Sequence, residues 1–136
     1  MKKFKHFTKL RNRNFKLHQS FFSTLDQYFI CPKVNQKVKT NFLAYPIILK
    51  NNLKFSRKEF QIYLEKNNIQ TRPIFTGNTL RHPAFKKLIS KKNKINQFRN
   101  SDYIMKNGLL IGCHQGLSSK DISYIHSVIL KFKKIK

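Results

Sequence analysis

Two short stretches of the sequence gather polar side chains that could bind an anionic or hydroxylated ligand. The first is TRPIFTGNTLRHPAF at 71–85, and the second is GCHQGLS at 112–118. A guanidinium donates two parallel hydrogen bonds to a phosphate or carboxylate, and asparagine and histidine side chains both donate and accept. We therefore take four residues of these stretches as candidate substrate-binding residues. They are Arg72, Asn78, Arg81 and His114.

Each candidate also has a purely structural interpretation. Arg72 could form a surface ion pair, although the chain has only five acidic residues. Gly77 and Asn78 also suit an ordinary turn, because glycine tolerates a positive φ. In the second stretch, a simple turn between a strand and a helix explains Gly116 and Ser118 equally well. No pattern assigns a catalytic base to either stretch.

The sequence holds no complete catalytic motif. It has no glycine-rich phosphate loop, no G-x-S-x-G elbow, no His/Cys/Asp cluster with metal spacing and no paired carboxylates. Cys31 and Cys113 lie far apart among apolar neighbours, which indicates reduced core residues. The polar loops therefore suggest one part of a site.

The elements that would position these loops alternate between helix and strand. Apolar residues at helical spacing predict a helix from about Phe4 to Phe29, which Pro32 ends. A polar loop over 34–41 follows, and then a buried strand over 41–50, in which a proline indicates an edge position or a bulge. That proline is Pro46.

Serine caps mark the later helices. Ser56 and Glu59 have the spacing of a capping box and predict a helix over 57–66, followed by extended chain over 69–75. The stretch 84–98 predicts a short helix and a mobile basic loop. The remaining expectations are a helix with Ser101 as N-cap, Asp102 in its first turn and Gly108 as its stop, a strand over 109–113, and a last helix capped by Ser118 with Asp121.

This order predicts a single small α/β (α+β) unit with a sheet of about three strands and helices packed on one face. We expect residues 1–30 to form an N-terminal linking helix and residues 31–136 to form the small domain. A length of 136 residues and a hydrophobic content of 40% allow one modest core.

The net charge of +24 gives a second functional hypothesis. Such a chain attracts polyanions, so the alternative to an enzyme part is a stand-alone basic RNA-binding or interaction module. Against it, the charge is spread along the chain, no named nucleic-acid motif is present, and the abundance of Lys, Asn, Ile and Phe is typical of AT-rich coding DNA. We therefore do not expect nucleic acid as the partner. No apolar run approaches the roughly 18–20 residues of a membrane span.

The two polar stretches resemble the C-terminal small domain of the DegT/DnrJ/StrS-type sugar aminotransferases. TRPIFTGNTLRHPAF, SDYIMKNGLLIGCHQGLSSKDISYI, RNRNF, YFICPKVNQ and FLAYPIIL follow one another in the order and spacing of the branch that contains CDP-4-keto-6-deoxyglucose 3-dehydratase. The resemblance runs from about Arg11 to Lys133.

This resemblance implies a fold-type I enzyme that uses pyridoxal 5'-phosphate, acts as a homodimer on nucleotide-linked keto-sugars, and serves deoxy- or amino-sugar formation for lipopolysaccharide or other surface glycans. It places Arg72, Asn78, Arg81 and His114 near the sugar nucleotide or the dimer edge. In the family, a large N-terminal domain supplies the Schiff-base lysine, or the histidine that replaces it in the 3-dehydratases, and the aspartate that faces the pyridine nitrogen.

Neither of those motifs occurs in these residues. We therefore expect a cytoplasmic C-terminal fragment that lacks the cofactor-binding domain, holds no cofactor by itself and is inactive alone, with a separate chain as a possible carrier of that domain. A decayed remnant of such an enzyme is the third interpretation.

Overall fold

The computed structural model describes residues 3–35, 37–88 and 97–132 of the chain. Its elements begin with α1 (Phe4–Ser23), β1 (Phe29–Ile30), β2 (Ala44–Leu49), α2 (Arg57–Lys66) and β3 (Thr71–Pro73). Two 3₁₀ helices follow, η1 (Thr79–Arg81) and η2 (Pro83–Leu88), and then α3 (Arg99–Asn107), β4 (Gly108–Gly112) and α4 (Ser119–Leu130). The basic loop expected after η2 lies at 89–96, outside the described residues.

The four strands found among the described residues form one antiparallel sheet in the order β1-β2-β4-β3. The expected α/β class is confirmed, but the sheet has four strands where about three were expected. The additional strand is β1, because α1 ends at Ser23 and not at Phe29. A turn over 24–28 lets Phe29 pair with Leu49, so the last apolar residue of the expected helix instead belongs to the sheet.

Pro46 lies in an interior strand, so the expected edge position is wrong for the sheet as a whole. The sheet nevertheless accommodates it locally. β1 pairs only with Ile48 and Leu49, and Pro46 pairs with Leu110 on the other side. Along Pro46, β2 therefore has a strand neighbour on one side only, which is a setting where proline is found in sheets.

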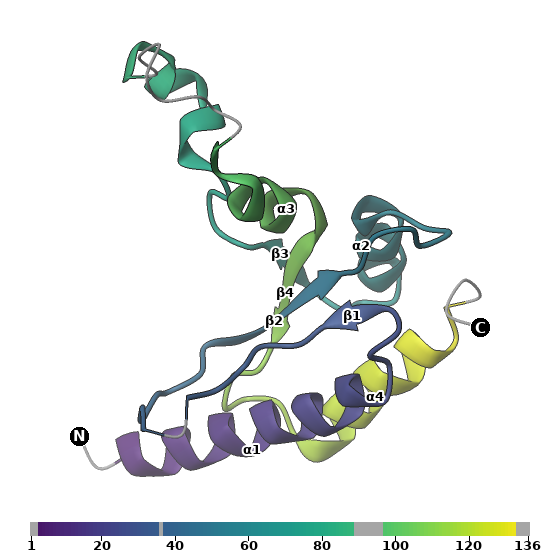
Figure 1. Cartoon of the computed structure of the whole chain (residues 1–136). Helices are drawn as coiled ribbons and strands as arrows, with labels where there is room; N and C mark the ends of the chain where they lie inside the picture. Colours follow the sequence, from purple (N-terminus) through teal and green to yellow (C-terminus); the bar gives the residue numbers. More distant parts are fainter. Residues whose placement is uncertain (1–2, 36, 89–96, 133–136) are drawn as a thin grey trace.

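Alternate residues of the strands divide the sheet into a covered and a more open face. Tyr45, Ile47 and Leu49 of β2 are buried, whereas the residues between them are only half-buried. α1 and α4 lie side by side across the covered face (Figure 1). Helices therefore pack on one face of the sheet, as the sequence predicts.

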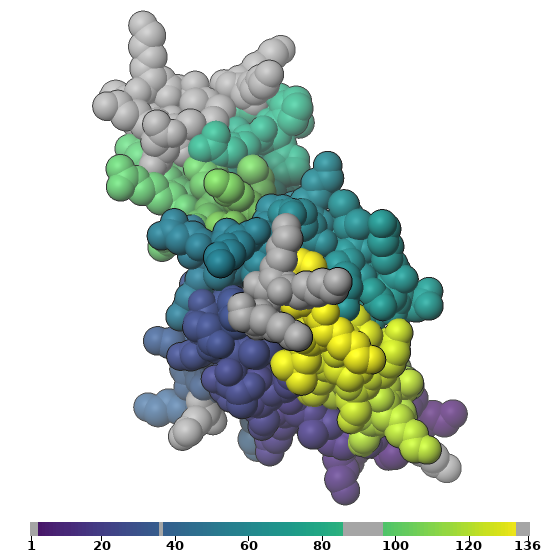
Figure 2. All heavy atoms as spheres, turned by 90° about the vertical axis from the view of Figure 1, so that its right-hand side faces the viewer, coloured from purple at the N-terminus to yellow at the C-terminus, as the bar shows by residue number. Residues whose placement is uncertain are grey.

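The core joins this covered face to α1, α2 and α4. Phe22 of α1 stacks on Tyr45 with ring centroids 5.3 Å apart, and Phe60 of α2 packs against Phe132 just beyond α4. Figure 2 shows the surface of α4 flanked by the end of α1 and by α2. The division at residue 30 stays a prediction, and α1 contributes to the same hydrophobic cluster as the rest of the chain.

Local capping confirms two of the three predicted helix starts. Ser56 with Glu59 and Ser118 with Asp121 both form complete capping boxes. The prediction for α3 is wrong in part. This helix begins two residues before Ser101, with Phe98 at its N-cap and no side-chain cap, although Gly108 does end it.

Candidate functional site

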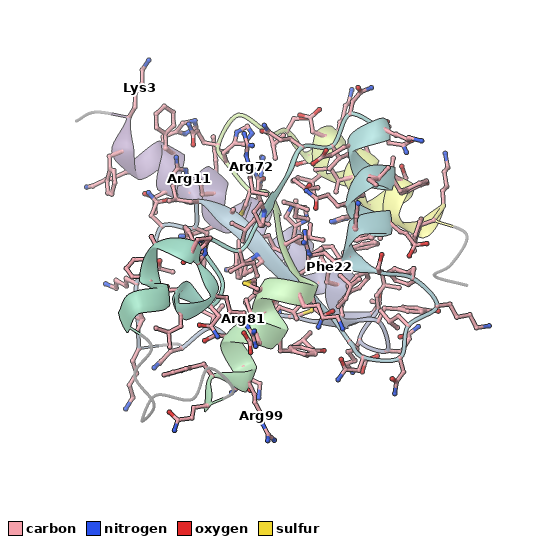
Figure 3. All side chains as sticks on the ribbon, turned by 90° about the horizontal axis from the view of Figure 1, so that it is seen from above. Lys3, Arg11, Phe22, Arg72, Arg81 and Arg99 are labelled. Carbon is pink, nitrogen blue, oxygen red and sulfur yellow. The ribbon has the colours of Figure 1, made fainter. Side chains whose placement is uncertain are left out.

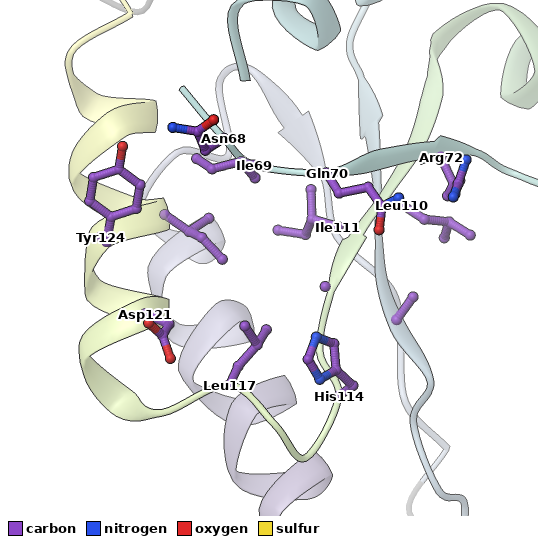
Figure 4. Close-up of a pocket in the computed structure, with 13 residues that line it drawn as sticks. Asn68, Ile69, Gln70, Arg72, Leu110, Ile111, His114, Leu117, Asp121 and Tyr124 are labelled. Atoms are coloured by element: carbon purple, nitrogen blue, oxygen red, sulfur yellow. The ribbon is translucent and has the colours of Figure 1, made fainter. Parts of the chain in front are cut away.

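A pocket of about 400 Å³ lies where β3, the end of β4 and the first turns of α4 meet. His114 enters it from the loop after β4, and Gln70 and Arg72 border it from the β3 side (Figure 4). Asn68, together with Asp121 and Tyr124 of α4, completes its polar lining. The structure thus brings Arg72 and His114, two of the four predicted site residues, to one pocket.

Arg72 lies on the edge strand β3, opposite Leu110 of β4. Its side chain is exposed, and within the described part of the chain it forms neither a hydrogen bond nor an ion pair. The surface ion pair that was the alternative interpretation is therefore not formed there. Arg72 still acts on Glu65, since it adds to the lowering of the pKa of that carboxyl, which hydrogen bonds from Thr71 and Gln61 mainly cause. Its guanidinium fork is available to a ligand.

His114 has a defined orientation because its ring and its backbone are both held. Its Nδ1 accepts a hydrogen bond from the Gly116 backbone N–H at 3.1 Å. The neutral imidazole therefore carries its proton on Nε2, which makes this nitrogen a donor. Its carbonyl oxygen accepts a hydrogen bond from Asn14 Nδ2 at 2.8 Å.

Helix α1 fastens the loop that carries His114. Arg11 Nε donates to Gln115 Oε1 at 2.8 Å, and Arg13 Nη2 donates to the Leu117 carbonyl at 3.0 Å. Buried Asn14 also lies 3.2 Å from that carbonyl. These bonds hold the loop from both ends, so the pocket wall depends on a helix that is distant in sequence.

One turn further along α1, a pair of histidines joins this helix to the end of β4 and to α4. His18 is fully buried, with its Nε2 2.9 Å from the Gly112 carbonyl and its Nδ1 3.0 Å from His126 Nε2 on α4. Burial lowers the pKa of His18 to about 4. Burial also lowers the pKa of His126 to about 4, and the neighbouring His18 adds to this effect. Both rings are therefore neutral at pH 7.

The other two predicted site residues, Asn78 and Arg81, do not line this pocket. Both donate hydrogen bonds to the carboxylate of Asp102 on α3. Asn78 is 3% exposed and donates to Asp102 Oδ1 at 2.8 Å, while its own Oδ1 accepts from the Leu80 N–H. Arg81 forms a bidentate ion pair with the same carboxylate. Figure 3 shows Arg81 beside α3 and well apart from Arg72.

In this second cluster, the side chains of Asn78, Arg81 and Asp102 form hydrogen bonds with one another. Hydrogen bonds from Arg81 and then Asn78 lower the pKa of Asp102 to about 2, so the carboxylate stays charged. The geometry gives Asn78 a role in joining 71–85 to α3. That Asn78 and Arg81 bind substrate stays a prediction.

Sequence reasoning missed the polar residues of α1 that hold the site. Arg11, Asn14 and His18 recur at spacings of three and four, so they share one helical face. Polar residues on a face that should be buried indicate specific buried partners. His126 of α4 was missed as well, and its ring stacks on Phe21 and bonds to His18.

The comparison with protein families identifies the fold. The model of the DegT/DnrJ/EryC1/StrS aminotransferase family matches residues 1–130. The chain belongs to this family.

Proteins similar to this chain match it over only part of their own length. The lipopolysaccharide biosynthesis protein RfbH of Salmonella typhimurium is 27% identical over 93% of this chain and 28% of its own. The GDP-4-keto-6-deoxy-D-mannose 3-dehydratase of Yersinia pseudotuberculosis is 26% identical over 96% of this chain and 32% of its own. This chain therefore spans about a third of the length of the curated relatives it matches.

A solved structure agrees with the family assignment. The Escherichia coli GDP-4-keto-6-deoxy-D-mannose 3-dehydratase, solved with bound hydrated pyridoxal phosphate, superposes with a TM-score of 0.77. It is 26% identical and is covered to 32%, while 93% of this chain takes part in the match. The fold is that of a part of the fold-type I pyridoxal-phosphate enzymes, as the resemblance predicts.

The pocket residues do not suit pyridoxal phosphate as the pocket's own cofactor. The pocket lining that the structure describes contains no lysine that could form a Schiff base. Its one carboxylate, Asp121, is occupied at the N-cap of α4, where hydrogen bonds from Ser118 lower its pKa. What the pocket offers instead is a guanidinium, an imidazole N–H and side-chain amides, which suit phosphate and hydroxyl groups.

Two further expectations concern the thiols and the membrane. Both cysteines are free thiols, and Cys113 is a buried core residue, whereas Cys31 is only half-buried. Burial raises the pKa of the Cys113 thiol to about 12, so it is unreactive at neutral pH. Among the residues with described positions, no helix is both long enough and apolar enough to cross a bilayer.

Proposed function

We propose that this chain forms the substrate-facing part of a cytoplasmic, pyridoxal-phosphate-dependent enzyme that acts on nucleotide-linked keto-sugars in deoxy- or amino-sugar formation for lipopolysaccharide or other surface glycans. One observation carries the proposal: Arg72 and His114 border a single pocket in a chain whose residues 1–130 match the aminotransferase family. The relatives named as 3-dehydratases of GDP-4-keto-6-deoxy-D-mannose support the sugar-nucleotide class.

In this proposal Arg72 binds the diphosphate. Its exposed guanidinium can donate two parallel hydrogen bonds to phosphate oxygens. His114 donates from Nε2 to a sugar hydroxyl or carbonyl oxygen, and the Gln70 amide adds a donor and an acceptor. Asn14 and Arg11 are positioning residues, because they hold the His114 loop without lining the pocket.

Pyridoxal phosphate supplies the electron sink of the family's chemistry when it is bound. We propose that residues outside these 136 hold it, on a separate chain that carries the rest of the family fold, and that the complete enzyme is a homodimer of this assembly. The chain corresponds in this view to the C-terminal third of its relatives. Alone it would bind sugar nucleotide weakly and convert none.

A titration with GDP-mannose tests the substrate-binding role. In spectra of the arginine Nε–H and histidine side chains, we expect Arg72 and His114 to shift on addition of GDP-mannose. Arg72→Gln removes a charge-assisted hydrogen-bond pair of about 1.5–3 kcal/mol, so we expect the dissociation constant to rise about 10- to 100-fold.

The matched control is Arg99→Gln, which removes one exposed arginine of α3 outside the pocket. An equal loss of affinity in both variants would indicate general attraction to a chain of charge +24 and would contradict the proposal. Unchanged affinity in Arg72→Gln would contradict it as well.

A basic RNA-binding module is the second candidate, and one face of α1 favours it. Lys5, Lys9, Arg13 and Lys16 recur at spacings of three and four and are all exposed, and α1 contains no acidic residue. A single-stranded RNA oligonucleotide distinguishes the two functions. Binding that persists at 150 mM salt and disappears in a Lys5/Lys9/Lys16→Gln variant would favour the module over the enzyme part.

A further inference from the structure

A second hollow of about 400 Å³ lies beside the candidate pocket. The two spaces share four lining residues, all from the segment that leads into β3: Asn68, Ile69, Gln70 and Arg72 (Figure 4). Glu65 of α2 and Thr71 complete the lining of the second space, which we call the Glu65 hollow. An extended ligand that binds at Arg72 can therefore reach from one space into the other.

Glu65 has surroundings that set it apart from the other four acidic residues of the chain. Glu59 and Asp121 are occupied in the capping boxes of α2 and α4. Asp102 is held in the ion pair described above, and Asp26 is an exposed residue of the turn after α1. Glu65 neither caps a helix nor forms an ion pair within the described part of the chain, and it borders a space large enough for part of a ligand.

Hydrogen bonds hold the Glu65 carboxylate in place through one of its two oxygens. Oε1 accepts from the Thr71 hydroxyl at 2.6 Å and from Gln61 Nε2 at 3.3 Å. Gln61 is itself oriented by Arg57, whose Nη1 donates to the amide oxygen at 2.8 Å. The bonds from Thr71 and Gln61 lower the pKa of Glu65, so the carboxylate is charged at neutral pH and can only accept. Among the described residues no side chain donates to Oε2, which leaves this oxygen to a ligand.

Glu65 and Arg72 influence each other without forming a bond. The guanidinium adds to the lowering of the carboxyl pKa, yet in the described part of the chain the two groups form neither an ion pair nor a hydrogen bond. Opposite charges that border one hollow and stay apart leave room for a group that satisfies both. Such a group has a phosphate for the guanidinium and, next to it, a hydrogen-bond donor for the carboxylate. A nucleoside diphosphate has this combination, because its ribose hydroxyls lie close to its phosphates and bind well to carboxylates.

Donors and acceptors also decide which end of a sugar nucleotide suits which space. The oxygen of a keto group can only accept, so it suits the Nε2–H of His114 and would be repelled by the Glu65 carboxylate. Ribose hydroxyls can donate, so they suit the carboxylate. Arg72 lies on the wall shared by both spaces, where the diphosphate between the two sugars would be.

We infer that the Glu65 hollow is a ribose subsite, in which the Glu65 carboxylate accepts hydrogen bonds from the vicinal hydroxyls of a nucleoside diphosphate whose phosphates bind Arg72. The inference rests on the proposed function and gives the substrate a direction across the segment 68–72. The nucleoside lies on the side of α2, and the keto-sugar lies on the side of His114.

Titrations of Glu65→Gln with GDP and with pyrophosphate test the inference, because the two ligands should respond in opposite directions. The variant keeps an oxygen for the Thr71 hydroxyl and removes the charge. We expect the dissociation constant of GDP to rise about tenfold, since a hydrogen bond to a charged acceptor is lost. Pyrophosphate lacks the ribose and is repelled by the carboxylate, so its dissociation constant should fall about two- to threefold. The matched control is Asp26→Asn, which removes an exposed charge outside the hollow and should change neither constant.

The dideoxyribose analogue of GDP, which lacks both hydroxyls, shows whether Glu65 recognises them. It should bind the parent chain about tenfold more weakly than GDP, and Glu65→Gln should weaken it no further. The side-chain carboxyl carbon of Glu65 gives a second measurement, on the parent chain itself, that does not depend on the folding of a variant. GDP should shift its NMR signal, and the analogue should not.

Three results would overturn the inference: unchanged or tighter binding of GDP to Glu65→Gln, an equal loss for GDP and its analogue in that variant, or no shift of the Glu65 carboxyl signal with GDP. Arg72→Gln separates the inference from the proposed function. If Arg72→Gln weakens GDP binding and Glu65→Gln does not, the inference alone fails. If Glu65→Gln shows the hydroxyl-dependent loss while Arg72→Gln binds GDP-mannose like the parent chain, the proposed function alone fails.

Discussion

His18 on α1 and His126 on α4 share a hydrogen bond whose direction is fixed by a third group. The Gly112 carbonyl can only accept, so His18 carries its proton on Nε2 and its Nδ1 must accept from His126 Nε2. His126 Nδ1 is left as the nitrogen that can take up a proton without breaking this chain of bonds. A proton on His18 Nδ1 would make this nitrogen a donor, so the bond to His126 would survive only if His126 moved its own proton to Nδ1, while His18 Nε2 would still donate to the Gly112 carbonyl.

The stability of the fold should therefore fall in mild acid. The pKa of both rings is about 4 in the folded chain and about 6.5 when unfolded, so the unfolded state binds more protons between these values. The stabilisation is complete above pH 6.5 and is lost as the pH falls toward 4. Urea midpoints measured from pH 7.5 to 4 should decline most steeply in that interval.

His126→Gln gives the matched comparison, because its amide still donates to His18 but does not titrate. We expect a shallower decline than in the parent chain. His6→Gln removes an exposed histidine and should leave the pH dependence as it is. A parent-like slope in His126→Gln would show that the pair does not cause the acid sensitivity.

Asn78 should prove to be a stability residue. Asn78→Ala removes a buried amide and leaves the Leu80 N–H and the Asp102 carboxylate without it, so we expect a loss of about 1–3 kcal/mol in the free energy of unfolding. Thr79→Ala, at the exposed neighbouring position, should change little. If Asn78→Ala unfolds like the parent chain but binds GDP-mannose less tightly, Asn78 contacts substrate and the structural role is wrong.

Gly77 should resist substitution for two separable reasons. A Cβ there would overlap with the Met105 side chain, and φ is +62°. Gly77→Ala should lose roughly 1–2 kcal/mol from the backbone alone and more from the overlap.

A double-mutant cycle with Met105→Ala separates these terms, since the smaller side chain relieves the overlap and leaves the strain. The double variant should recover part of the stability lost in Gly77→Ala. Purely additive effects in chemical denaturation would contradict the close contact.

The chain by itself should form no specific aldimine with pyridoxal phosphate. The described lining of the pocket has no lysine, so reduction of a mixture with borohydride should label several exposed lysines at low occupancy. Peptide mapping by mass spectrometry gives the occupancy at each lysine. One lysine labelled at about one equivalent per chain would show that the chain holds the cofactor after all.

Much of the fold follows from local sequence rules. The capping boxes at Ser56 and Ser118 and the apolar stripe of α4 predict their helices because the determining residues lie within one or two turns. The end of α1 was missed because Leu25 and Phe29 keep helical spacing and both are buried. In the structure, however, Leu25 lies in a turn and Phe29 lies in β1. Periodicity records which residues face the core, and it does not record which element carries them there.

The site was predictable only in part. The two polar stretches were recognised, but their grouping depends on which strand neighbours which. Arg72 and His114 border one pocket because β3 pairs with β4. Arg81 instead forms an ion pair with Asp102 on α3, outside that pocket. Such long-range partners are set by tertiary packing, which spacing along the chain does not contain.

The two edges of the sheet have a consequence for how the molecule can assemble. β1 is two residues long, and β3 ends in an arginine and a proline, which are features that discourage another strand from adding to an edge. Growth of the sheet from chain to chain is therefore disfavoured at both edges. A molecule with an exposed apolar surface and such edges can associate face to face, while strand addition of the kind that leads to fibres is disfavoured.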